Sequence, residues 1–180
     1  MIRSFIIVAL FLCVTTSVFA QTPAIIPQVG ISNPEELDNA TLLGIATDLW
    51  EVRPDFTIGT AIDFWRHTIY FNDEPTSPYF YRTTYAALGI YAKYMVNSDQ
   101  QFYQLYAGLG PALHVIRSNT DNGDPTVQIA LPGGEKIGLD IFSGVEIDLS
   151  KRISWIVQGG YRLVSELSQS VLTTGVKIQL

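Results

Sequence analysis

The chain has 180 residues and a formal net charge of −6, from 17 acidic and 11 basic side chains. A chain of this length predicts a single domain, and an acidic chain without clustered lysine and arginine is not expected to bind nucleic acid. Its one cysteine, Cys13, excludes an intramolecular disulfide.

Residues 1–20 have the features of an export signal. Arg3 precedes an apolar run from Phe5 to Val14, and the small residue Ala20 ends the segment. The run is shorter than the roughly 20 residues that a membrane-spanning helix needs. We therefore expect residues 1–20 to be a cleaved signal peptide and residues 21–180 to form one domain without cysteine.

Clusters of Pro, Asn, Asp and Gly divide the remaining chain into segments in which apolar and polar residues alternate, the pattern of β-strands. The first segment is the weakest, because Pro23 and Pro27 interrupt it and only Val29 and Ile31 show the alternation. The eight predicted strands span residues 24–31, 40–51, 55–66, 81–96, 101–117, 136–149, 152–164 and 171–180.

The connections between these strands alternate between longer and shorter. A transmembrane barrel of the bacterial outer membrane has an even number of strands, short periplasmic turns and longer extracellular loops. The sequence therefore predicts an all-β fold, an eight-stranded antiparallel up-and-down transmembrane β-barrel.

The segment 138–150, "GLDIFSGVEIDLS", shows the two faces of one such strand. Leu139, Ile141 and Val145 alternate with polar positions that include Asp140 and Glu146. An eight-stranded barrel has an interior only wide enough for side chains. We expect the apolar face to meet lipid and the carboxylates to lie inside.

The polar faces of the strands carry charges of both signs, separated by glycines, and we expect these charges to pair inside the barrel as a structural network. The predicted members are Asp63, Lys93, Asp140, Glu146, Arg162 and Lys177. The same alternation points large aromatic rings inward, where they should fill the bore and exclude a large pore. These rings are Trp50, Trp65, Tyr85, Tyr91, Tyr106 and Phe142.

Aromatic residues on the apolar faces cluster near the short turns. Phe56, Tyr94, Tyr103 and Trp155 each lie within a few residues of such a turn. Aromatic rings of this kind concentrate where lipid meets water. We expect these four residues to form a periplasmic aromatic girdle.

Four segments carry a resemblance to a known family: "YAALGIYAKYMV", "YAGLGPALHV", "GLDIFSGVEIDLSKRISWIVQGGYRL" and "TTGVKIQL". They resemble strands of the outer-membrane β-barrel family that includes small OmpA- and OmpX-type and opacity-like porin proteins, over roughly residues 41–180. The resemblance implies location in the cell outer membrane of a Gram-negative bacterium, contact with outer-membrane lipid, and insertion by the barrel-assembly machinery through the C-terminal strand. Leu180 replaces the aromatic residue that usually ends this strand in the family.

The expected function is a non-enzymatic one, an envelope-structural or surface-interaction role through the long extracellular loops, where a surface ligand would bind. The loop from Thr68 to Tyr81 combines aromatic and acidic residues and is the main candidate surface. No catalytic residue, cofactor or metal site is expected, and the oligomeric state is left open.

Three alternatives remain at this point. The first is a narrow pore or channel. The second is a lipid A-modifying barrel enzyme, for which the available groupings are His114 with Ser118, and His67 near Asp73 and Glu74. The third is a soluble periplasmic carrier barrel, which would place its aliphatic face inside.

Overall fold

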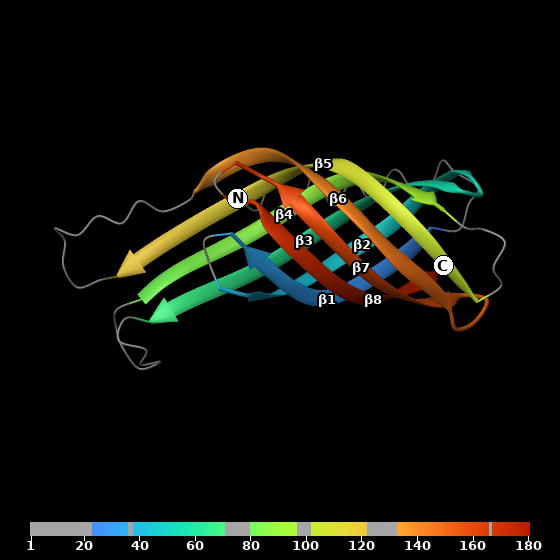
Figure 1. The fold of residues 1–180 in the computed structure, drawn as a ribbon, viewed down its shortest axis with the longest axis horizontal. Coiled ribbons are helices and arrows are strands. Elements are labelled where there is room, and N and C mark those ends of the chain that lie inside the picture. The colour runs from blue at the N-terminus through green and yellow to red at the C-terminus, as the bar shows by residue number, and fades with distance from the viewer. Residues whose placement is uncertain (1–22, 36–37, 71–79, 97–101, 122–132, 166) are drawn as a thin grey trace.

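In the computed structural model, the described residues form a closed antiparallel β-barrel of eight strands in chain order (Figure 1). The described residues are 23–35, 38–70, 80–96, 102–121, 133–165 and 167–180. The strands are β1 (Ala24–Pro34), β2 (Ala40–Arg53), β3 (Phe56–Tyr70), β4 (Phe80–Met95), β5 (Tyr103–Asp121), β6 (Gly134–Asp148), β7 (Ile153–Leu163) and β8 (Gln169–Gln179). The predicted fold class is therefore confirmed.

The two ends of the barrel differ. The connections β2–β3, β4–β5 and β6–β7 lie at one end, here called the short-turn end, where Ala24 of β1 also pairs with Gln179 of β8. The other connections lie at the opposite, long-loop end. Figure 1 shows β3, β4 and β5 extending beyond the other strands at the long-loop end.

Two prolines interrupt ladders of the wall without opening it. The pairing of β1 with β8 stops after Ile25 and resumes at Gln28, on either side of Pro27. The pairing of β4 with β5 likewise skips Pro111 and its neighbour Gly110. Because proline has no backbone N–H, it cannot donate to a ladder. The first strand nevertheless forms, and it closes the barrel.

A β-bulge in β2 makes one sequence prediction wrong. The strand alternation places Trp50 inside the barrel, but the register with β3 shifts between Asp48 and Trp50. Asp48 lies opposite Gly59 and Trp50 opposite Ile58, so that one extra residue reverses the alternation. Trp50 is consequently 41% exposed on the outer face.

The polarity of this barrel is the inverse of a soluble one. Large apolar side chains are exposed on the outer face of every described strand. One from each strand, in chain order, is Ile31, Leu43, Ile62, Ile90, Leu109, Ile141, Trp155 and Leu172. Charged and aromatic side chains are buried on the inner face.

Glycines make room for the rings that fill the bore. Three inward rings each lie opposite a glycine on the adjacent strand, in the pairs Tyr91–Gly59, Phe142–Gly108 and Tyr106–Gly144. The rings also contact one another, with edge-on centroid separations of 5.5 Å for Tyr91–Phe142 and 6.3 Å for Tyr106–Phe142. Each large ring thus packs over a glycine of the neighbouring strand, and together the rings fill the interior.

The substitution Gly144→Ala is expected to lower the free energy of unfolding by about 1–3 kcal/mol. An added Cβ would lie 2.5 Å from both Tyr106 Oη and the carbonyl oxygen of Val157, so the ring and the adjacent strand must shift. Gly159→Ala is the matched control, because a Cβ there meets no described atom within 4 Å. Urea unfolding of the refolded protein in lipid vesicles measures both variants, and equal effects would contradict this packing role.

Candidate functional site

Four charged side chains form a closed ring inside the barrel towards the short-turn end. Lys93 Nζ lies 2.6 Å from Asp48 Oδ2 and 4.0 Å from Glu146 Oε2. Lys177 Nζ lies 3.0 Å from each of the same two carboxylates. Each cation therefore bridges both anions, and the four charges balance. The members come from β2, β4, β6 and β8, one from every second strand.

Tyrosine side chains complete the surroundings of this ion-pair ring. Tyr91 donates a hydrogen bond of 2.8 Å to Asp48 Oδ1. The Nζ atom of Lys93 lies over the ring of Tyr106, 5.3 Å from the ring centroid. The Tyr106 hydroxyl donates a hydrogen bond of 3.1 Å to Gln158 Oε1. Asp48 thus has a hydrogen-bond partner beyond its ion pairs, and Lys93 has a cation–π contact.

A second charged cluster lies further towards the long-loop end. The guanidinium of Arg162 is ion-paired with Asp63 through Nη2, and its Nε lies 3.7 Å from Asp140 Oδ2. Gln28 donates to the other oxygen of Asp63 at 2.9 Å. Arg162 also lies over the ring of Tyr85, at 5.7 Å. Arg162 of β7 thus contacts residues of β3, β4 and β6 directly, and it reaches Gln28 of β1 through Asp63.

His114 extends this second cluster but leaves two polar atoms without a partner. Its Nδ1 shares a hydrogen bond of 2.5 Å with the Tyr85 hydroxyl. Its Nε2 lies 3.6 Å from Asp140 Oδ1, and neither of these buried atoms has a hydrogen-bond partner among the described residues. Asp140 thus lies between Arg162 and the imidazole of His114.

Apolar and aromatic packing separates the second cluster from the long-loop end. Trp65 and Tyr85 stack with centroids 5.1 Å apart, and Leu42, Ile116 and Leu167 are buried around them. The indole N–H of Trp65 donates to Gln169 Oε1 at 2.9 Å. This layer is a plug across the bore.

A cavity of about 70 Å³ lies within the bore. Its lining includes Gln28, Asp63, Lys93, Asp140, Gln158 and Arg162, so it touches both charged clusters. The volume is sufficient for a few water molecules.

All six residues of the predicted polar network lie inside the barrel, but they divide between two clusters. Lys93, Glu146 and Lys177 belong to the ion-pair ring, and Asp63, Asp140 and Arg162 to the second cluster. Two partners lie outside the six predicted residues. Asp48 has an inward polar position in the sequence pattern and pairs with Lys93 and Lys177. Gln169, which accepts from Trp65, lies before the predicted start of the last strand.

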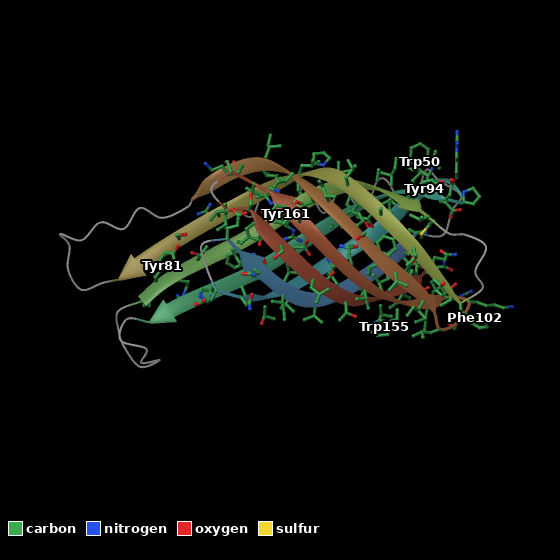
Figure 2. All side chains as sticks on the ribbon, viewed as in Figure 1. Trp50, Tyr81, Tyr94, Phe102, Trp155 and Tyr161 are labelled. Carbon is green, nitrogen blue, oxygen red and sulfur yellow. The ribbon has the colours of Figure 1, made fainter. Side chains whose placement is uncertain are left out.

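The four predicted girdle residues lie on the outer face near the short-turn end. Phe56 is in register with Tyr94 across β3 and β4, and Ile147 is in register with both Tyr103 and Trp155. Trp50 joins them because of the bulge. Figure 2 shows Trp50, Tyr94, Phe102 and Trp155 gathered towards this end of the barrel.

The predicted catalytic grouping of His114 with Ser118 is not formed in the structure. His114 is fully buried, and Ser118, four residues along the same strand, lies roughly 13 Å away. That separation prevents a nucleophile–base pair. Among the described residues no group of three or more His, Cys, Asp or Glu side chains could hold a metal ion. Asp73 and Glu74, proposed as partners of His67, lie outside the described residues.

No helix among the described residues is long and apolar enough to cross a membrane. The closed antiparallel wall, apolar outside and ion-paired inside, is the architecture of the small barrels that span bacterial outer membranes with their strands.

Comparisons with known proteins agree with this class. The attachment invasion locus protein Ail of Yersinia pestis has a TM-score of 0.59 and 10% identity, over 89% of this chain and 97% of that chain. The N-terminal β-barrel domain of Pseudomonas aeruginosa OprF has a TM-score of 0.58 and 12% identity, over 89% and 98%. Neisserial surface protein A has a TM-score of 0.56 and 12% identity, over 88% and 96%.

These identities show a common fold, so the resemblance to small outer-membrane barrels is confirmed at that level. No protein-family model matches the sequence, and no curated protein does either.

The substitution Arg162→Met is expected to lower the free energy of unfolding by about 3–5 kcal/mol, because it leaves Asp63 and Asp140 buried without their cation. The double variant Arg162→Met, Asp63→Asn should recover part of this loss. Arg152→Met, in an exposed turn, is the control and should change stability by no more than about 0.5 kcal/mol. Urea titrations of all variants give the double-mutant cycle, and strict additivity would show that the buried pair is not coupled.

Proposed function

We propose that this protein is a non-enzymatic outer-membrane barrel that serves envelope structure or surface interaction through its long loops. The observation that supports it is the inverted polarity of the barrel, with apolar side chains outside and paired charges inside. In water, such a surface would expose apolar patches on every side, which soluble proteins rarely do. In lipid, the same surface is buried and every strand of the closed wall has paired neighbours.

The height of the apolar surface supports a membrane span. On β3 the outward residues run from Phe56 through Ile58, Thr60, Ile62 and Phe64 to Arg66. Ten residues of strand measure about 33 Å, or about 25 Å along the axis of a barrel whose strands tilt by roughly 40°. This matches the apolar band of about 25 Å in transmembrane barrels. The girdle at Phe56, Tyr94, Tyr103 and Trp155 would then lie at one membrane interface.

Orientation and export follow from the same proposal. Residues 1–20 direct export and are removed, and the short-turn end with both chain ends of the barrel faces the periplasm. The barrel-assembly machinery would recognise β8, and Leu180, which directly follows it, donates its backbone N–H to the carbonyl of Pro23 at 3.0 Å. The long-loop end then faces outward.

The filled interior favours a structural role for the six network residues and opposes a wide pore. The ion-pair ring, the Tyr91–Phe142–Tyr106 rings and the Trp65–Tyr85 plug follow one another along the bore. A narrow pore would require these layers to rearrange together. The soluble carrier alternative is opposed by the charged interior, which offers no apolar lumen for a ligand.

A surface-interaction role gains support from the names of proteins that share the fold. Ail is described as an attachment invasion locus protein and was solved in complex with the heparin analogue sucrose octasulfate. We assign the surface-interaction role of this chain to its long loops. Residues 71–79 and 122–132, which include most of the aromatic and acidic candidate loop, lie outside the described residues.

The proposal is tested by fractionating cells that express the full chain and running the membrane fraction on gels with and without boiling. We expect an outer-membrane species that needs detergent for extraction and changes mobility on heating, and no stepwise conductance in planar bilayers. A species in the periplasmic extract without a heat-dependent shift would refute the membrane location. Conductance steps would favour the narrow pore instead.

A charge placed on the outer face should lower the free energy of unfolding more, the deeper it lies in the membrane. Ile90 is 59% exposed on β4, four residues from Tyr94 and six from Thr84, whereas Ile137 is 83% exposed and is followed outward by Glu135. In lipid vesicles we expect Ile90→Arg to lower the free energy of unfolding by about 2–4 kcal/mol and Ile137→Arg by about 0–1 kcal/mol. Equal and negligible effects would indicate that the outer face meets water.

A further inference from the structure

The basic residues of the described chain fall into three groups. Four face the interior: Lys93, Lys136, Arg162 and Lys177. Three lie in the connections or strand ends at the short-turn end: Arg53, Lys151 and Arg152. The remaining three, here called the arginine patch, project outward from the barrel wall: Arg66, Arg82 and Arg117. No interior ion pair accounts for this third group, so it needs a separate explanation.

The strand register brings the arginine patch together on three adjacent strands. Arg66 of β3 is in register with Thr84 of β4, which is in register with Arg117 of β5. Since neighbouring strands lie about 5 Å apart, the Cα atoms of the two arginines are about 10 Å apart. Arg82 lies two residues beyond Thr84 on the same face. Three guanidinium groups therefore surround one small hydroxyl residue.

The arginine patch begins where the apolar band ends. The next row towards the short-turn end is Phe64, Ala86 and Val115, which are also in register with one another. All three strands thus change from apolar to polar or basic at the same row. In a barrel that spans the membrane, this change marks where each of the three strands leaves the lipid tails for the headgroups, at heights offset from strand to strand by the tilt.

One arginine is already held in place, and no described ion pair neutralises the patch. Arg82 donates through Nε to Thr68 Oγ1 at 3.3 Å and stacks on the ring of Phe80 at 4.6 Å. No ion pair joins a patch arginine to a carboxylate among the described residues. Two described strands carry a carboxylate residue near the patch: Glu135 of β6 is in register with Val115, one row below Arg117, and Asp121 of β5 is in register with Phe80. The described surroundings leave the patch with excess positive charge.

We propose that the arginine patch binds the phosphate groups of a phosphorylated glycolipid of the lipid A type in the outer leaflet. The planar guanidinium binds phosphate through paired hydrogen bonds, and a glycolipid that carries two phosphates on a broad sugar headgroup can engage arginines that span three strands. The apolar residues below, Phe64 and Val115, would contact its acyl chains. This inference rests on the membrane orientation proposed above and adds a lipid ligand to it.

The test uses the full chain purified from outer membranes, freed of lipid in detergent and placed in phosphatidylcholine nanodiscs. Three lipids are titrated as probes: bisphosphorylated lipid A, monophosphorylated lipid A and phosphatidylglycerol. The test variant is Arg66→Gln, Arg82→Gln, Arg117→Gln. The matched control is Arg53→Gln, Lys151→Gln, Arg152→Gln, which removes the same charge from the opposite end of the barrel.

We expect the test variant to bind bisphosphorylated lipid A about a hundredfold more weakly, about fivefold for each arginine. The control variant should bind as the wild type does, and the wild type should prefer two phosphates to one and lipid A to phosphatidylglycerol. Equal losses in both variants, or equal affinity for phosphatidylglycerol, would overturn the inference. Heat-dependent gel mobility checks that each variant is folded.

The two proposals fail in different ways. A wild-type protein that enters neither the outer membrane nor the nanodisc refutes the membrane span and this inference together. A protein that inserts normally but shows no preference for bisphosphorylated lipid A refutes this inference alone.

Discussion

The structure depends on neutralising charge inside a closed wall. An isolated ion in this interior would lose several kcal/mol of hydration, so each buried charge must face an opposite one. Asp48, Lys93, Glu146 and Lys177 meet this requirement because alternate strands of a tilted barrel bring their inward side chains to a common level. The ring therefore fixes the relative heights of four strands at once. The wall, the apolar exterior and the filled bore are all consistent with that one arrangement.

Most of the fold was predictable because one physical pattern, alternation with period two, determines both secondary structure and side-chain direction. Pro and Gly clusters marked the turns, and the observed strand ends lie within four residues of the predicted ones. The same pattern failed at Trp50, since a bulge inserts a residue without any distinctive sequence signal. Alternation can place Asp63 and Arg162 inside, but it cannot show that they touch.

The contacts of the site depended on information that a single sequence lacks. Cross-bore partners are set by the shear of the barrel, which follows from the register of all eight strands together. Gln169 illustrates a second limit, because it accepts hydrogen bonds from Trp65 and Ser32 but lies in a segment that the sequence assigns to a turn. The arginine patch shows a third, since its members are far apart in the chain and become neighbours only through strand pairing.

The proline interruptions at Pro27 and Pro111 have a mechanical consequence. The two weakened ladders, β1–β8 and β4–β5, lie on opposite sides of the barrel and divide its wall into two half-shells of four strands each. The pairs Lys177–Asp48 and Arg162–Asp63 each join one half-shell to the other across the bore. The interior charges thus connect the two half-shells across the bore and resist flattening of the cross-section, in addition to the hydrogen bonds of the wall.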